Sequence, residues 1–217
     1  MDAIMNDLLL MVPIALIPST AFIFSRLSQR MGKHKGYLLG FFFYWIFWCL
    51  LFPTLLLETD GFLSLFVDKT PLLSRQNWLV AVLWAVITLV TFLMYGKDFI
   101  KAPLTLICIA IPAATINGVC EEILWRGIYV RLFPENFWLA VVLPALGFAL
   151  WHLVPLSIFS DGNKWSFVIS TFFLGLAYGF IAFKTGSATW TAISHSLNGI
   201  LALSGMLAPS ILRISKR

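Results

Sequence analysis

The stretch LTLICIAIPAATINGVCEEILWRGIYVRLF, residues 104–133, is apolar enough to cross a membrane, yet it carries two adjacent carboxylates and an arginine. A transmembrane helix needs about 20 predominantly apolar residues, and this stretch is longer. Because it also contains Pro112 and Gly118, we expect it either to bend or to divide into a short interfacial piece and a crossing. Ionisable groups at membrane depth are costly and usually mark a pathway or a site.

The whole chain shares this apolar character. Of its 217 residues, 60% are hydrophobic and 12% are charged, and the mean hydropathy is +0.91. A typical soluble domain has about 25% charged residues. No pattern of alternating polar and apolar residues favours membrane strands, so the spans are expected to be helices, which satisfy their own backbone groups in lipid. The sequence therefore predicts an all-α, polytopic transmembrane bundle, with residues 1–217 forming a single membrane domain in the lipid bilayer.

Seven spans are predicted, within a range of six to eight. Short polar segments separate them, among them PEN (134–136) and KTGS (184–187). The predicted helices cover residues 8–25, 37–57, 78–95, 104–133, 137–156, 165–183 and 188–208. We expect the first to be retained rather than cleaved as a signal peptide, because the residues before it, MDAIMND, are acidic and contain no Lys or Arg.

The distribution of Lys and Arg predicts the orientation. With seven crossings, the loops 26–36, 96–103 and 157–164 lie on one side together with the tail 209–217. That side carries ten of the 15 Lys and Arg residues. The N-terminus is therefore expected outside and the C-terminus in the cytoplasm, in the cell membrane if the source is bacterial. This topology explains the net charge of +5, so no nucleic-acid partner is expected.

A small set of polar residues lies within the predicted spans, and helix geometry brings several of them to one depth. The set consists of Glu121, Glu122, Arg126, His152, His195 and Asn198. Glu121 precedes the PEN turn and His152 follows it, so at about 1.5 Å per residue both lie roughly 20–24 Å from that turn. His195 lies roughly 12 Å into its helix and reaches the same layer if the helices tilt.

The spacing of the charged residues predicts different roles for the two carboxylates. Glu122 and Arg126 are spaced i, i+4 with the acid first, the better orientation for a helical ion pair. One arginine cannot neutralise both acids, and adjacent carboxylates repel, so Glu121 is free to bind a proton or a cation. Together, Glu121, His152 and His195 suit either general-base activation of a water or a divalent metal site, with zinc as the first choice. A purely structural ion pair and proton- or ion-coupled transport remain open as alternatives.

Three motifs follow one another along the second half of the chain. EEILWRG (121–127) fits E-E-x-x-x-R, and FALWH (148–152) fits F-x-x-x-H. In GLAYGFIAFKTGSATWTAISHSLNG (175–199) a histidine is closely followed by an asparagine. Over roughly residues 104–208 the chain resembles the CPBP or Abi family, the CAAX-protease and bacteriocin-processing membrane endopeptidases. Three ordered motifs on successive helices are far more specific than any one of them.

This resemblance implies an intramembrane endopeptidase of the glutamate/histidine type, proposed to be metal-dependent, with its active site in a conical cavity of the bundle. By matching position, Glu121 would activate the water or ligate the metal, and His152 would share that role. Glu122 and Arg126 would organise the helix. His195 and the asparagine would stabilise the oxyanion or complete the site. The substrate would be a peptide or protein at the membrane, including one that is prenylated or has a C-terminal membrane segment.

The third motif departs from the family pattern. The usual form is H-x-x-x-N, whereas this chain has Gly199 at the fourth position after His195 and Asn198 at the third. These two positions differ by about 100° around a helix. We expect Asn198 either to reach the site through a slight rotation or to hydrogen-bond a neighbouring helix. The departure also leaves open a non-catalytic immunity or scaffold protein of the same fold.

Overall fold

The computed structural model describes the backbone of residues 2–159 and 163–214 and the side chains of residues 7–159 and 163–204. Within the searched part of the chain, six helical segments are long and apolar enough to cross a membrane. They are Asp7–Met31, Lys33–Phe66, Trp78–Ile100, Leu104–Leu132, Trp138–Phe159 and Lys164–Thr185. These segments confirm the first six predicted spans. The seventh, 188–208, falls in a helix that extends beyond the searched residues.

The regular elements before residue 103 are all helices. They are α1 (Asp2–Met31), α2 (Lys33–Phe43), the π-helical segment η1 (Tyr44–Leu51), α3 (Phe52–Leu63), the 3₁₀ turn η2 (Ser64–Phe66) and α4 (Trp78–Ile100). The elements after it are α5 (Leu104–Glu122), the π-helical η3 (Ile123–Gly127), α6 (Ile128–Leu132), the π-helical η4 (Trp138–Val142), α7 (Leu143–Trp151), α8 (Leu153–Phe159), α9 (Lys164–Thr185) and α10 (Thr189–Ile214). The described residues therefore form the predicted all-α bundle.

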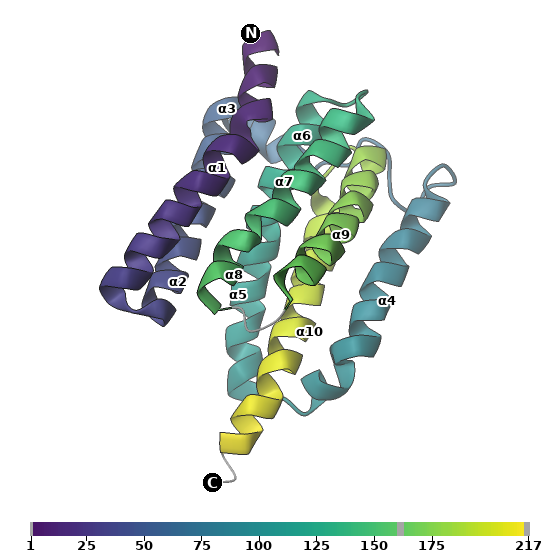
Figure 1. The fold of residues 1–217 in the computed structure, drawn as a ribbon. Coiled ribbons are helices and arrows are strands. Elements are labelled where there is room, and N and C mark those ends of the chain that lie inside the picture. The colour runs from purple at the N-terminus through teal and green to yellow at the C-terminus, as the bar shows by residue number, and fades with distance from the viewer. Residues whose placement is uncertain (1, 160–162, 215–217) are drawn as a thin grey trace.

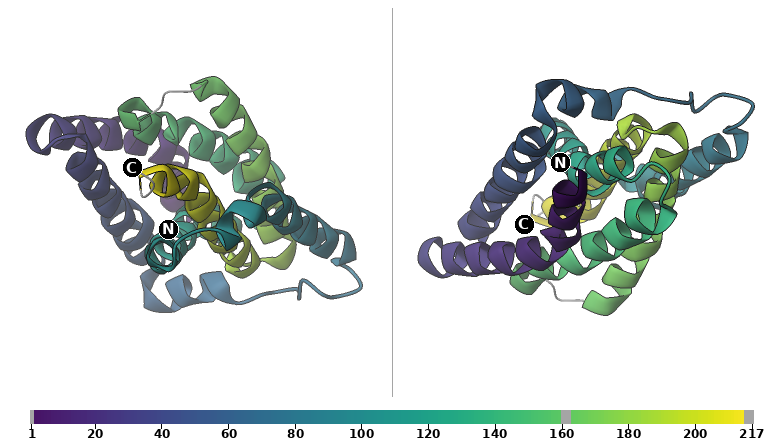
Figure 2. Two further views of the ribbon diagram at one scale, coloured as in Figure 1. Left: turned by 90° about the horizontal axis from the view of Figure 1, so that it is seen from below. Right: turned by 90° about the horizontal axis from the view of Figure 1, so that it is seen from above.

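The helices run roughly side by side, with the start of α1 and the end of α10 at opposite ends of the bundle (Figure 1). α10 packs against α5 and α4. The end-on views in Figure 2 place α10 near the middle of the bundle, with α1 and α2 on one side and α4 on another. α4 exposes large apolar side chains, among them Leu79 and Leu93, as expected for a helix that faces lipid.

The pair α5 and α10 packs closely because small residues lie where the two helices meet. A Cβ added at Gly118 of α5 would lie 2.8 Å from the backbone nitrogen of Ser196 in α10. A Cβ added at Gly199 of α10 would lie 3.0 Å from the Cβ of Ala114 in α5. This close approach holds the carboxylates of α5 beside the imidazole of α10.

The long predicted segment 104–133 is one continuous helical stretch, Leu104–Leu132. Pro112 lies inside α5 without ending it, so a division into two separate pieces is wrong. The stretch changes instead at η3, where five residues, Ile123–Gly127, are π-helical. Short π-helical turns within α-helices are frequent at functional sites, and this one follows directly after the two carboxylates.

The N-terminal helices are joined to the rest of the bundle by aromatic side chains. The indole nitrogen of Trp125 donates a hydrogen bond to the Tyr44 hydroxyl at 2.8 Å, and the Tyr129 hydroxyl donates to the Leu9 carbonyl at 3.0 Å. The ring of Tyr44 stacks on Trp151 with centroids 4.0 Å apart. The core of the molecule therefore lies where α1 and η1 contact η3, α6 and α7.

Candidate active site

The two adjacent carboxylates end α5, and both are buried. The carboxylate oxygen Oε1 of Glu122 accepts a hydrogen bond from Nη1 of Arg126 at 3.0 Å. The same oxygen lies 2.8 Å from Nδ1 of His195 on α10. The ion pair expected from the i, i+4 spacing is present, and His195 adds a second partner that the spacing did not predict.

Arg126 lies in η3 and is also buried. Its guanidinium carbon is 4.3 Å from the ring centroid of Phe148 in α7 and 5.6 Å from that of Tyr178 in α9. Aromatic faces attract a cation, and more strongly so when water is excluded. Arg126 therefore balances the charge of Glu122 and also holds α7 and α9 against the helix that carries the carboxylates.

Glu121 differs from its neighbour in having unused hydrogen-bonding capacity. Within the described part of the chain, neither of its buried carboxylate oxygens has a hydrogen-bond partner. Its Oε2 lies 3.4 Å from Nε2 of His195, close enough for charge interaction but not aligned as a hydrogen bond. An unpaired buried carboxylate is costly, so the lone pairs of Glu121 are available to a water or another ligand.

His152 lies at a break between α7 and α8. Pro155 accounts for that break, because its ring clashes with the carbonyl four residues before it. The imidazole Nδ1 of His152 is 2.8 Å from the Phe148 carbonyl oxygen. A carbonyl can only accept, so Nδ1 carries the hydrogen, and Nε2 of the neutral ring has a lone pair.

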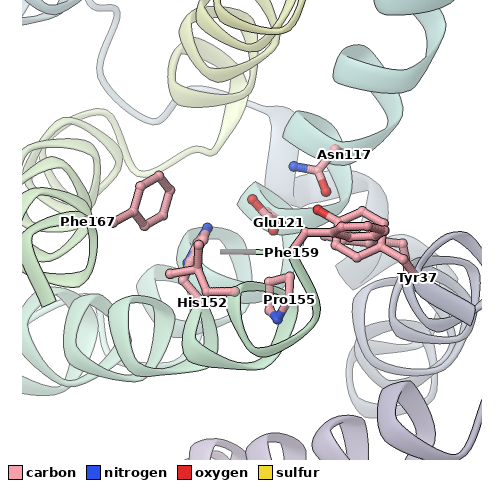
Figure 3. A pocket seen from close by; sticks show the side chains of 9 residues that line it. Tyr37, Asn117, Glu121, His152, Pro155, Phe159 and Phe167 are labelled. Atoms are coloured by element: carbon pink, nitrogen blue, oxygen red, sulfur yellow. The ribbon is translucent and has the colours of Figure 1, made fainter. Parts of the chain in front are cut away.

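Glu121 and His152 line the same cavity, which has a volume of about 250 Å³. Figure 3 shows the two side chains on neighbouring walls of this cavity. The lining side chains are Tyr37, Phe41, Asn117, Glu121, His152, Pro155, Leu156, Phe159 and Phe167. The common depth predicted for Glu121 and His152 across the PEN turn is therefore observed.

His195 lines a neighbouring cavity of about 330 Å³. Its walls are mainly apolar and include Tyr37, Phe41 and Trp45 from the second span. His195 reaches the layer of the two carboxylates, as predicted, because its ring nitrogens lie 2.8 Å from Glu122 and 3.4 Å from Glu121. It is not among the residues that line the cavity of Glu121 and His152.

Asn198 hydrogen-bonds a neighbouring helix, which is the second of the two arrangements predicted for it. Its Nδ2 donates a hydrogen bond to the Tyr178 hydroxyl on the neighbouring α9 at 2.8 Å. It does not line the cavity of Glu121 and His152. The glycine at the next position has a physical reason, since the contact of Gly199 with α5 leaves no room for a longer side chain.

Several residues of these walls were not singled out as site residues from the sequence. Asn117 lies one helical turn before Glu121, and its Oδ1 accepts a hydrogen bond from the Trp45 indole at 3.0 Å. The spacing of four residues puts Asn117 and Glu121 on one face of α5, a signal that the sequence contained. The contributions of Tyr37 and Phe41 carried no such signal, because they depend on how the second span packs.

The donor types also allow a test of the predicted metal. A glutamate and two histidines with an open position suit zinc. Among the side chains that the structure describes, however, no group of three or more His, Cys, Asp and Glu is close enough to hold a metal ion. In the described arrangement Glu121, His152 and His195 are not gathered as three ligands, and zinc at these residues stays a prediction.

The fold and the site define a class: a polytopic helical membrane protein with a buried carboxylate and imidazole facing a cavity. Residues 103–201 match the family model described as Rce1-like, the type II CAAX prenyl endopeptidases. This match confirms the resemblance to CAAX proteases for a region that covers a little under half of the chain and contains all three motifs. At the level of the family it supports a CAAX-protease-type intramembrane endopeptidase. No curated protein and no solved structure gives a significant match.

Proposed function

We propose that this protein hydrolyses a peptide bond in a peptide or protein substrate at the membrane, with Glu121 and His152 acting on a water. The observation that carries the proposal is that these two side chains line one cavity within a transmembrane bundle. Glu121 has free carboxylate oxygens there. A positioned carboxylate beside a water is the arrangement that general-base catalysis needs.

The chemistry follows from the atoms present. Glu121 takes a proton from the water while the water oxygen forms a bond to the carbonyl carbon of the scissile peptide. His152 orients that water by accepting its other hydrogen at Nε2. Glu121 then returns the proton to the amide nitrogen as the carbon–nitrogen bond breaks. The products are a new carboxyl terminus and a free amine, so all atoms balance.

The other predicted residues support this pair. In the proposal, Arg126 and Glu122 keep the end of α5 in place, and His195 steadies both carboxylates from α10. The mainly apolar cavity beside His195 suits a substrate with an apolar segment or a prenyl group. A CAAX-type tail is therefore the first substrate class to test.

We also propose an orientation of the bundle in the membrane. The α1–α2 and α4–α5 connections lie at the same end of the bundle as the end of α10 (Figure 1). The α1–α2 end of the bundle carries Arg26, Arg30, Lys33 and Lys35. Positive charge is enriched on the cytoplasmic side, so this end would face the cytoplasm and the N-terminus the outside.

The test is cleavage of quenched fluorescent peptides by the purified full chain in liposomes. The peptides end in C-a-a-X tails, each prepared with a free and with a farnesylated cysteine. We expect Glu121→Gln and His152→Ala to lower kcat by about 10²–10⁴-fold, the usual contribution of general acid–base groups. Glu135→Gln, at an exposed carboxylate in the loop after α6, is the matched control and should cleave like the wild type.

Equal cleavage by the wild type, Glu121→Gln and His152→Ala would refute the proposal. Failure of the wild type to cleave any peptide would favour the non-catalytic scaffold or transporter alternatives. Metal content measured on the same preparations tests the zinc prediction separately. A stoichiometric metal that is lost in His152→Ala would support ligation, and cleavage that persists without metal would contradict it.

A further inference from the structure

The attack on a peptide carbonyl creates negative charge on its oxygen, and that charge needs hydrogen-bond donors aimed at it. The two groups assigned to the water do not supply one. Glu121 is an acceptor when ionised, and His152 uses its Nδ1 hydrogen on the Phe148 carbonyl. In the neutral ring Nε2 then has a lone pair rather than a hydrogen. A donor must come from another wall of the cavity.

The residues expected from the sequence to stabilise the oxyanion face elsewhere. His195 directs both ring nitrogens at carboxylates, at 2.8 Å from Glu122 and 3.4 Å from Glu121. The amide nitrogen of Asn198 is used on the Tyr178 hydroxyl. Neither residue lines the cavity in which Glu121 and His152 meet.

Asn117 is the side-chain amide on that cavity wall. The Trp45 indole nitrogen, which can only donate, lies 3.0 Å from its Oδ1. This contact fixes which end of the amide is oxygen. The nitrogen, with two hydrogens, is left on the opposite side of the amide, and Figure 3 shows it on the side of Glu121.

The position of Asn117 also suits a substrate that enters between the two cavities. Asn117 lines both the cavity of Glu121 and His152 and the mainly apolar cavity beside it. A substrate whose apolar part occupies the second cavity would pass this amide before its peptide bond reaches Glu121. Tyr37 lines both cavities as well, so its hydroxyl is the rival donor.

We propose that Asn117 is a catalytic residue whose Nδ2 donates a hydrogen bond to the carbonyl oxygen of the scissile peptide, and that Trp45 is the positioning residue that orients it. The inference rests on the proposed peptidase function. The hydrogen bond strengthens as the water oxygen bonds to the carbonyl carbon and charge moves to the carbonyl oxygen. It weakens again when that charge returns to re-form the carbonyl and the amine leaves, so Asn117 neither gains nor loses a proton.

The first test compares Asn117→Ala and Asn117→Leu with the wild type, using a peptide that the wild type cleaves. Removing one oxyanion donor costs about 10²–10³-fold in kcat, and we expect a loss of that size with KM changed by less than about threefold, because the bond strengthens in the transition state. Leucine keeps the branched shape of the asparagine side chain without its polar atoms. Thermal unfolding of both variants shows whether the fold is retained.

The second test examines the positioning role of Trp45. Trp45→Phe keeps the aromatic ring and removes the hydrogen bond to Asn117, and we expect kcat to fall by up to about 100-fold through misplacement of the amide. In the Asn117→Ala background the same substitution should have no further effect on kcat, because there is no amide left to orient. Trp48→Phe, in the same helix, is the matched control and should leave kcat unchanged.

The outcomes separate this inference from the proposed function. If the wild type cleaves a peptide and Asn117→Ala and Asn117→Leu fold and cleave it at the same rate, the role of Asn117 is refuted while the peptidase function stands. A large kcat loss in Tyr37→Phe together with normal Asn117→Ala would make the tyrosine hydroxyl the donor and would also refute it. Losses in Trp45→Phe and Asn117→Ala that simply add would refute the positioning role. If the wild type cleaves nothing, both proposals fall together.

Discussion

The N-terminal part of the bundle, residues 7–66, and the region 103–201 are built on different interactions. In residues 7–66 the buried side chains are apolar or aromatic apart from Thr20. The region 103–201 buries two carboxylates, one guanidinium and several hydroxyl groups. It is also the region that the family comparison covers. On the proposed function, the reacting groups therefore lie in the region 103–201, while residues 7–66 contribute cavity walls.

The contrast shows that side chains without charge form part of the site. Tyr37, Phe41 and Trp45 lie outside the matched region, yet they line the cavities at the site. Trp45 also orients an amide of α5. We infer that the region 103–201 carries out the reaction and that residues 7–66 shape the space through which a substrate reaches it. Three substitutions test this division, in order of expected effect.

The largest effect is expected where charge is buried in the region 103–201. Arg126→Leu leaves the buried carboxylate of Glu122 without its guanidinium partner. Breaking a buried pair in this way costs about 3–5 kcal/mol. We expect the free energy of unfolding in detergent to fall by that amount and peptide cleavage to be lost with it.

The double variant Glu122→Gln with Arg126→Met is the control for Arg126→Leu. It removes both charges while keeping an amide oxygen for His195, and replacing a whole buried pair is often close to neutral. We expect it to regain more than half of the lost stability. A double variant as unstable as Arg126→Leu would show that packing, rather than charge, holds this region.

A smaller effect is expected where α5 and α10 meet. Gly118→Ala introduces a Cβ 2.8 Å from the backbone nitrogen of Ser196, so the two helices must separate. Overpacking of this kind costs about 1–3 kcal/mol, and kcat should fall because Glu121 moves away from His195. Thermal unfolding and cleavage assays measure the two effects.

Gly96→Ala in α4 provides the comparison for Gly118→Ala. There the nearest atom is 3.3 Å away and belongs to the ring of Phe92, which can turn aside. Alanine favours a helix by about 1 kcal/mol over glycine. We expect stability and kcat to stay near the wild type. Equal losses at both glycines would contradict the special closeness of α5 and α10.

The smallest effect on cleavage is expected at the junction of the two regions. Tyr44→Phe removes the acceptor of the Trp125 indole hydrogen bond and leaves a buried donor unpaired, which costs about 1–3 kcal/mol. Cleavage by the folded fraction should be unchanged. A kcat loss in Tyr44→Phe would show that the junction influences catalysis directly.

Much of the fold could be predicted from the sequence because lipid imposes strong rules. Length and hydropathy placed all six spans, although the predicted second span ends at residue 57 and the observed segment extends to Phe66. The π-helical segment after Glu122 could not be predicted, because it depends on tertiary packing rather than on local propensity. The same holds for the glycine contacts between α5 and α10, which require knowing which helices are neighbours.

The features of the site that depend on residue spacing could be predicted from the sequence. The pair of Glu122 and Arg126 followed from i, i+4 geometry, and the common depth of Glu121 and His152 followed from the short PEN turn. The direction of a side chain at that depth did not follow, since Asn198 turns toward α9 instead of the cavity. Contributions from the second span were out of reach, because no local pattern tells which helix will cover the site.

The contact of His195 with both carboxylates has a consequence for the order in which the site forms during synthesis. His195 is synthesised well after Glu121, and at about 5–20 residues per second the interval is roughly 4–15 s. During that interval the inserted helices hold Glu121 and Glu122 without the imidazole that steadies them. On the proposed mechanism, the carboxylates of α5 therefore gain this support only when α10 has joined the bundle.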